Sequence, residues 1–166
     1  MPRFIHALAL IGALATAAVF ATGALAGGNS SNAKLCQKDG WQSLQKGDGG
    51  SFASEDECVS YGAQRGSVFA PSLTVDPTHV PEETNSAVTA SGFHPNSKGD
   101  LEITTLGGGG GSVTFLNIPT TSTGGLAPFG TVFAAGACAK GVTGVLLTFT
   151  DDFGVHASAT VALDCA

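Results

Sequence analysis

The sequence predicts an all-β sandwich preceded by a small segment that a disulfide bond holds together. Seven short stretches of alternating residues, rich in β-branched and aromatic side chains, lie between residues 72 and 166. Gly, Pro, Asn and Asp separate these stretches, as is typical of strands joined by turns, and no helical period competes with them. The 166 residues suffice for one or two small domains. Charged residues make up only 12% of the chain, which also has 24 glycines.

The first 26 residues have the features of a secretory signal peptide. Arg3 precedes the apolar run Phe4–Phe20, and the small-x-small pattern Ala24–Ala26 follows. A transmembrane helix needs about 20 apolar residues, whereas His6 interrupts this run and polar residues follow it. We therefore expect residues 1–26 to be cleaved after Ala26. The mature protein is then secreted and extracellular, with no transmembrane segment.

Four cysteines lie beyond the signal peptide, at Cys36, Cys58, Cys138 and Cys165. They permit three disulfide pairings, and their sequence neighbourhood favours Cys36–Cys58 and Cys138–Cys165 because each pair brackets one distinct segment. A zinc site is the alternative, but the chain has no Cys-x-x-Cys and no histidine at ligand spacing from a cysteine. Export favours oxidised pairs. We expect two disulfides and no metal or cofactor.

Residues 27–66 are expected to form a small module around the first disulfide. Ser54 followed by Glu57 is the pattern of a capping box, so a helix is predicted over about 55–64. Trp41, Phe52 and Tyr61 are the aromatic residues expected to pack on the Cys36–Cys58 bridge. Three aromatic rings and a disulfide can stabilise a segment that is otherwise too small to fold. Residues 67–71, which contain a proline, are expected to be a short linker.

The residues of this module resemble a short motif found in secreted proteins of actinobacteria. The matching residues are Cys36, Gly40-Trp41, Phe52 and Cys58-Val59-Ser60-Tyr61. Asp39 and Asp56 stand where that motif has glycine. The resemblance covers about 25 residues and implies a secreted bacterial protein, with no activity attached to it.

The remainder, residues 72–166, supplies the sandwich. The stretches expected as its strands are Leu73–Val75, Ala87–Phe93, Leu101–Leu106, Ser112–Ile118, Phe129–Phe133, Val145–Phe149 and Val155–Leu163. Seven short strands at regular spacing over this length are typical of a β-sandwich.

Two turns of this part resemble the immunoglobulin-like repeats of exported bacterial proteins. Ser91–Ser97 is similar to the turn that follows the second strand in those repeats, and Thr150–Gly154 is similar to their penultimate hairpin. Cys165 closes the last strand, as a cysteine often does there. His94 and Asn96 depart from the small residues usual in that turn. The resemblance implies an antiparallel immunoglobulin-like sandwich used for adhesion, spacing or ligand display, without catalytic residues.

Catalytic patterns in the mature chain are weak. Its histidines are His79, His94 and His156, and no Gly-x-Ser-x-Gly turn is present to hold a nucleophilic serine. His156 alternates with apolar neighbours on an expected strand and should point to solvent. A hydrolase would bring one histidine within about 3.2 Å of a serine hydroxyl or a carboxylate inside a cleft. We expect no catalytic residues and no enzymatic activity, with a secreted hydrolase as the remote alternative.

Glycine-rich and acidic stretches also have structural interpretations. The run Gly107–Gly111 lacks the Lys-Ser/Thr and the helix of a phosphate-binding loop, and a flexible hairpin tip fits it better. Glu82-Glu83 and Asp151-Asp152 are adjacent pairs in expected loops, where carboxylates are usually solvated. Asp151 and Asp152 could contribute to a calcium site, although calcium takes six to eight oxygens.

Charge and architecture together leave two main functional hypotheses. A net charge of −6 excludes a generic electrostatic nucleic-acid binder. The first hypothesis is a non-catalytic extracellular or cell-surface binding or adhesion protein whose ligand or surface partner is unknown. The second is a small-molecule carrier with an apolar cleft in the sandwich. Ordinary core packing is the alternative role for the phenylalanines that would line such a cleft, which are Phe115, Phe129, Phe133, Phe149 and Phe153.

Overall fold

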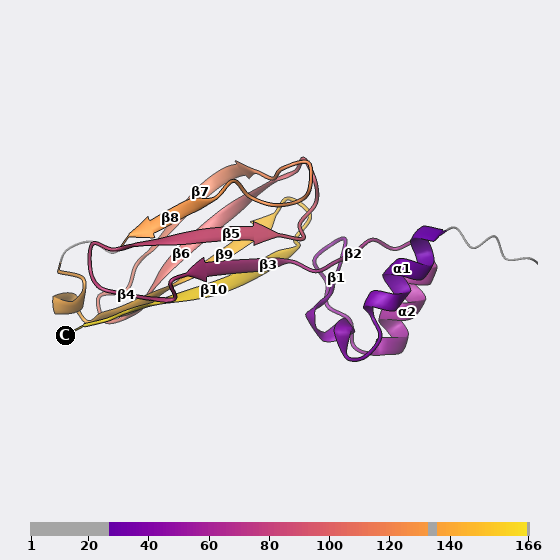
Figure 1. Ribbon diagram of the computed structural model, residues 1–166, viewed down its shortest axis with the longest axis horizontal. Coiled ribbons are helices and arrows are strands. Elements are labelled where there is room, and N and C mark those ends of the chain that lie inside the picture. Colours follow the sequence, from indigo (N-terminus) through magenta and orange to yellow (C-terminus); the bar gives the residue numbers. More distant parts are fainter. Residues whose placement is uncertain (1–26, 133–135, 166) are drawn as a thin grey trace, which may run out of the picture.

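The computed structural model describes residues 27–132 and 136–165. Its helical elements are α1 Gly27–Leu35, η1 Gly40–Ser43, α2 Glu55–Ala63 and η2 Cys138–Lys140. Its strands are β1 Gln45–Lys46, β2 Val68–Phe69, β3 Ser72–Asp76, β4 His79–Val80, β5 Asn85–Ser91, β6 Lys98–Gly107, β7 Ser112–Pro119, β8 Phe129–Val132, β9 Val142–Asp151 and β10 His156–Leu163. Figure 1 shows the helices α1 and α2 at one end of the molecule and the longer strands at the other.

The N-terminal part, residues 27–69, is built around the disulfide between Cys36 and Cys58. Both cysteines are fully buried together with Leu44 and Phe52. Trp41 and Tyr61 pack against this cluster, and the rings of Phe52 and Tyr61 meet edge to face with centroids 5.5 Å apart. The disulfide and these aromatic rings therefore give this small part a core of its own.

Helix α2 begins where the sequence predicts and ends one residue earlier. The Ser54 hydroxyl accepts a hydrogen bond from the Glu57 amide at 3.2 Å. The expected return bond differs, because the Glu57 carboxylate accepts from the Ala53 amide at 2.7 Å and from Lys46 at 2.7 Å. Glu57 therefore ties the helix start to β1 as well as capping it. Helix α1, with four of its nine residues Gly or Ser, was not predicted from the sequence.

The expected linker is shorter than residues 67–71. Val68 and Phe69 form β2, which pairs antiparallel with Lys46 and Gln45 of β1. Backbone pairing thus assigns these two residues to the N-terminal part. Only residues 70 and 71 join it to β3.

The two-sheet part, residues 72–132 and 136–165, contains a five-stranded and a three-stranded sheet. The strand order is β4-β10-β9-β6-β7 in the larger sheet and β3-β5-β8 in the smaller one. Neighbouring strands pair antiparallel except β4 and β10, which are parallel. β7 and β8 are therefore edge strands of their sheets (Figure 1).

Every predicted stretch of this part contributes to a strand, and the sheets add the short β4. The predicted stretches at 101–106 and 145–149 extend to ten residues each in β6 and β9. Pairing on both sides explains the greater length of β6. It lies between β9 and β7, and together these neighbours form backbone hydrogen bonds with residues on either side of the predicted stretch. β5 ends at Ser91, so Phe93 lies in the following turn with its side chain buried.

The core lies between the two sheets and is almost wholly aliphatic and phenylalanine. Phe93 and Phe149 meet edge to face at its centre, with ring centroids 4.9 Å apart. The fully buried apolar residues around them are Val80, Val88, Leu147, Val155 and Val161. Burial alternates along β3, β5 and most of β9, as expected of strands with one face buried.

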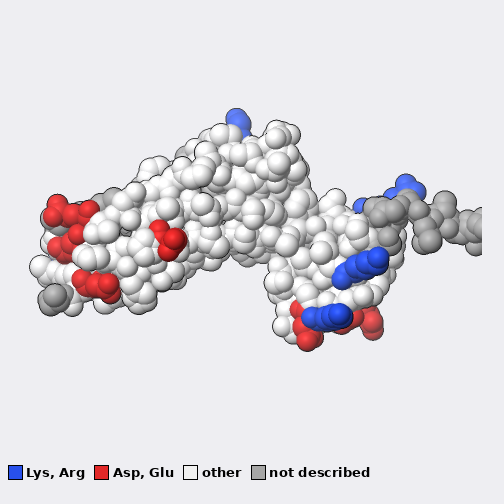
Figure 2. Space-filling model, viewed as in Figure 1, with Lys and Arg blue, Asp and Glu red and all other residues white. Residues whose placement is uncertain are grey.

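The second disulfide joins Cys138 of η2 to Cys165 beyond β10. Both disulfides have the pairing that the sequence favours. Figure 2 shows Asp and Glu side chains gathered at the end of the two-sheet part farthest from the helices. Within the described residues, no helix is long and apolar enough to cross a bilayer.

Candidate ligand-binding site

An apolar pocket lies at the open side of the two-sheet part, where the edge strands β7 and β8 leave the sheets unclosed. One wall comes from β6 and β7, and the other comes from residues 127–130 at the start of β8. β3 packs against β10, so the smaller sheet covers the larger one from that side. With only three strands against five, the smaller sheet leaves the β7 side open.

The pocket has a volume of about 420 Å³. Its lining residues are Leu101, Ile103, Phe115, Ile118, Pro119, Ala127, Pro128, Phe129 and Gly130. No lining residue has a charged or hydrogen-bonding side chain. The volume lies within the range of about 300–1,000 Å³ typical of small-molecule sites. The geometry therefore suits an apolar body rather than an ion.

Local sequence explains why the pocket stays open. In β6, Leu101 and Ile103 point to the same face because side chains alternate. Opposite Leu101 stands Phe115 of β7, which remains 49% exposed because no strand of the smaller sheet covers it. Pro119 is the last residue of β7, and Pro128 lies just before β8. Their fixed φ angles limit backbone rearrangement at these positions. A wall of this kind is largely formed before any ligand arrives.

The predicted cleft phenylalanines are placed in three different environments. Phe115 and Phe129 line the pocket. Phe149 is fully buried in the core against Phe93. Phe153 lies on the 151–156 hairpin with its ring 4.2 Å from that of His94. Phe133 is outside the described residues.

Sequence reasoning missed most of the aliphatic lining. Leu101 and Ile103 were recognised only as alternating strand residues, which does not separate core from pocket. Pro119 and Pro128 had no place in the sequence argument. Their signal was the position of one proline directly after an apolar stretch and of another directly before one, which is typical of edge strands.

A second notable cluster joins His94 and Asp151. The His94 Nδ1 atom lies 2.8 Å from Asp151 Oδ2, and the Asp151 side chain is fully buried. The same carboxylate accepts hydrogen bonds from the amides of His94, Phe153 and Val155 at 3.0–3.1 Å. The rings of Phe153 and Phe69 both pack against the imidazole ring at a tilt, with centroid distances of 4.2 and 4.0 Å.

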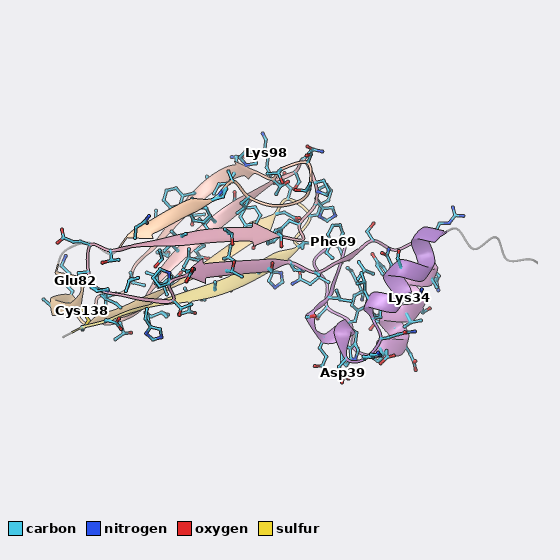
Figure 3. All side chains as sticks on the ribbon, viewed as in Figure 1. Lys34, Asp39, Phe69, Glu82, Lys98 and Cys138 are labelled. Atoms are coloured by element: carbon cyan, nitrogen blue, oxygen red, sulfur yellow. A yellow bond between two sulfur atoms is a disulfide. The ribbon has the colours of Figure 1, made fainter. Side chains whose placement is uncertain are left out.

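This cluster meets the distance expected of a hydrolytic histidine and carboxylate but not the expected setting. It lies at the contact between the N-terminal and two-sheet parts, where Phe69 is labelled in Figure 3, and neither His94 nor Asp151 lines the apolar pocket. Within residues 27–132 and 136–165, no hydroxyl group hydrogen-bonds to the imidazole; Ser97 Oγ donates instead to the His94 carbonyl. The contacts of His94 and Asp151 connect the turn after β5, the 151–156 hairpin and Phe69 of the N-terminal part.

The other described histidines, His79 and His156, are exposed. His79 Nδ1 lies 3.5 Å from an oxygen of Asp164, with both side chains more than half exposed. His156, expected to face solvent, is exposed and its backbone contacts Gln45. Neither histidine belongs to the pocket lining.

The acidic pairs divide into one bound and one exposed residue each. Glu82 accepts hydrogen bonds from the amides of Gly136 and Cys138, while Glu83 is exposed. The four donors on Asp151 leave its carboxylate little capacity for calcium. In the part of the chain that the structure describes, no group of three or more His, Cys, Asp or Glu residues could hold a metal ion.

The glycine run forms the tip of the β6–β7 hairpin. The Gly108 amide donates to the Gly141 carbonyl at 2.7 Å, and Thr105 Oγ1 accepts from the Gly111 amide. Ser112 then begins β7. This hairpin tip therefore lies beside η2, and strand structure follows it instead of the helix that a phosphate-binding loop needs.

Comparison with known proteins adds little to these observations. No protein-family model matches the chain, and no curated protein sequence matches it significantly. Among solved structures, macromomycin is similar over 57% of this chain and 100% of its own, with 16% sequence identity and a TM-score of 0.40.

Proposed function

We propose that the chain is a secreted, non-catalytic protein that carries a neutral, apolar small molecule in the pocket between β7 and β8. The observation that carries this proposal is the pocket of about 420 Å³, whose lining side chains are all apolar. A small β protein usually fills such space with its own side chains. Here Phe115 remains half exposed at the pocket instead of packing inward.

The lining also specifies the charge of the ligand. No lysine or arginine lines the pocket, so an anionic ligand would lose hydration without gaining a partner. The net charge of −6 adds general repulsion of anions. A cation would find no carboxylate in the lining. A neutral molecule, ring-containing so that it packs between Phe115 and Phe129, fits best.

Export and an immunoglobulin-like architecture belong to the same proposal. Residues 1–26 act as a signal peptide, and the two disulfide bonds are typical of an oxidising compartment. Two facing sheets with mostly antiparallel pairing support an immunoglobulin-like sandwich. Of the two functional hypotheses, adhesion and carriage, the pocket favours carriage because an adhesion domain needs no internal apolar space.

Binding of N-phenyl-1-naphthylamine, a neutral probe that fluoresces in apolar sites, tests the proposal. We expect saturable binding of this neutral probe in the micromolar range. An anilinonaphthalene sulfonate, a similar probe with one negative charge, should bind more weakly. Phe115→Ala should weaken binding of the neutral probe about tenfold, since removing a ring contact costs about 1.4 kcal/mol.

Phe153→Ala is the matched control, because Phe153 is similarly exposed and lies outside the pocket. Binding to this variant should equal that of the wild type. Ala127→Phe, which places a ring inside the pocket, should abolish binding. Absence of saturable binding, or equal effects of Phe115→Ala and Phe153→Ala, would show that the pocket carries no ligand of this class.

A further inference from the structure

Strand β7 is an edge strand that lacks the usual protection against pairing with another chain. It lies at one end of the five-stranded sheet, and none of its eight residues is charged. Val113 and Phe115 are each 49% exposed, and Leu116 is 66% exposed. Edge strands are commonly protected by lysine, proline, a bulge or a covering element. Here Pro119 and the irregularity at Asn117 protect only the last residues of the strand.

The backbone bonds of the β6–β7 hairpin show which groups of β7 point away from the sheet. The Thr105 amide donates to the Gly111 carbonyl at 2.9 Å. Because bonded and non-bonded pairs alternate in an antiparallel ladder, the backbone groups of Val113 and Phe115 also point to β6. The backbone N–H and C=O groups of Ser112 and Thr114 then point away from β6, toward the open edge. The same holds for Leu116, which lies just before the irregularity. Three residues in alternation thus present free donors and acceptors to an added strand.

We propose that this edge pairs antiparallel with β7 of a second copy, around a two-fold axis at Thr114. The outward residues are arranged symmetrically about Thr114, so Ser112 pairs with the partner's Leu116 and Thr114 with the partner's Thr114. Val113 then lies opposite the partner's Phe115. Thr–Thr and aromatic–β-branched pairs are among the favourable cross-strand combinations. A second copy therefore supplies a matching strand without any foreign sequence.

Charge supports a second copy as the occupant. Two chains that each have a net charge of −6 repel, so a contact between them requires a surface without like charges. β7 itself has no charged residue. The carboxylates beside it belong to Glu102, the β6 neighbour of Thr114, and to Asp100, which accepts a hydrogen bond from the Asn117 amide at the far end of the strand. Three strand spacings put the two Glu102 backbones about 14 Å apart, beyond the screening length of about 8 Å in physiological salt.

The dimer would also change the pocket. Phe115 lines the pocket, and pairing would place the partner's Val113 beside it on the same face of the joined sheet. The two pockets would then lie next to each other over β7 and the partner's β7. This consequence rests on the proposed function, whereas the pairing itself does not. One strand per copy is a small interface, so we expect a dissociation constant of about 10–100 µM.

Sedimentation velocity of the oxidised, exported chain tests the pairing. The wild type should shift from monomer to dimer as its concentration rises through this range. Thr114→Lys should be monomeric, because the two-fold axis puts the two introduced charges opposite each other, and Thr114→Glu should be monomeric for the same reason. An equimolar mixture of the two variants should form a dimer again, which also shows that both are folded.

Thr74→Lys is the matched control. Thr74 is also an exposed threonine on an edge strand, but its strand, β3, belongs to the smaller sheet. It should dimerise like the wild type. A wild type that stays monomeric at about 500 µM, well above the expected constant, overturns the proposal. So does a Thr114→Lys variant that dimerises as well as Thr74→Lys, because the contact then lies elsewhere.

Two further readouts separate this proposal from others. If the wild type is monomeric but an extended synthetic peptide shifts the amide resonances of residues 112–116, the edge accepts a foreign strand and the second copy is the wrong occupant. Binding of N-phenyl-1-naphthylamine to the monomeric Thr114→Lys variant tests the pocket alone, because Thr114 is not part of its lining. Loss of dimerisation and failure of the pocket are thereby measured independently.

Discussion

At the scale of single residues, Asp151 joins the turn after β5 to the turn between β9 and β10. Its buried carboxylate receives three backbone amides and the His94 ring. An ionised carboxylate can only accept hydrogen bonds, so His94 Nδ1 carries the proton in this contact. Among the described residues, no buried side-chain nitrogen or oxygen lacks a hydrogen-bond partner. Burying this charge is tolerated because every lone pair is used.

Replacing Asp151 tests this arrangement. Asp151→Asn turns one acceptor into a donor that faces amide hydrogens, so we expect the free energy of unfolding to fall by about 3 kcal/mol. Urea denaturation followed by far-ultraviolet circular dichroism measures the loss. Asp152→Asn is the control, as Asp152 is exposed, and it should change stability by less than about 0.5 kcal/mol. Equal effects would contradict the role assigned to Asp151.

At the scale of elements, Glu82 connects the β4–β5 loop to the start of η2. Its two carboxylate oxygens accept from the amides of Cys138 at 2.6 Å and Gly136 at 3.0 Å. Figure 3 shows Glu82 and Cys138 close together at the end far from the helices. These amide hydrogen bonds, that of Cys138 first, lower the pKa of Glu82 below its ordinary value of 4.5. The disulfide to Cys165 anchors the same short helix to the end of β10.

The lowered pKa predicts a pH dependence of stability. A carboxyl group whose pKa is lower in the folded state stabilises the fold above its unfolded pKa, and this contribution disappears as the pH falls through the folded pKa. Glu82→Gln should therefore be less stable than the wild type at pH 7. The difference should shrink as the pH is lowered below about 4.5. Thermal unfolding at a series of pH values measures it.

Glu83→Gln is the control for this experiment, because Glu83 is the exposed neighbour of Glu82 in the same loop. Its difference from the wild type should be small at every pH. A Glu82→Gln deficit that persists unchanged in acid would mean that shape rather than charge supports η2.

At the scale of the whole molecule, the N-terminal part is held against the two-sheet part by several short contacts. The Gln45 side chain donates to the His156 carbonyl at 2.7 Å and accepts from the His156 amide at 2.9 Å. Phe69 stacks on His94. Gly49, with φ +80°, approaches the Gly154 backbone so closely that no Cβ fits between them. These contacts converge on His94 and the 151–156 hairpin that Asp151 organises.

Gly49→Ala should loosen the contact between the two parts. The added methyl group collides with the Gly154 carbonyl, and positive φ disfavours alanine as well. We expect cleavage near residues 67–71 by a broad-specificity protease to accelerate about tenfold. This corresponds to a free energy of opening that is lower by about 1.4 kcal/mol. Gly111→Ala is the control, because nothing lies within 4 Å of its Cβ position. Unchanged cleavage of Gly49→Ala would show that the two parts are held elsewhere.

The sequence by itself determined the local features. Alternating β-branched residues predict the strands, and Ser54 with Glu57 predicts the start of α2, because these signals act over a few residues. Cysteine spacing predicts both disulfide pairs because each closes a short loop around one segment. The length of β6 and β9 was underestimated, since polar strand residues are kept in place by neighbouring strands rather than by their own propensity.

Only the tertiary structure decided which apolar residues are core and which line a pocket. Phe149 and Phe115 occupy similar alternating stretches, yet one is fully buried and the other is half exposed. The difference arises from the position of their strands in the sheets, since β9 lies inside the larger sheet and β7 at its edge. The same cause brings His94 to Asp151, 57 residues away. Strand order is set by long-range pairing, which leaves no local trace in the sequence.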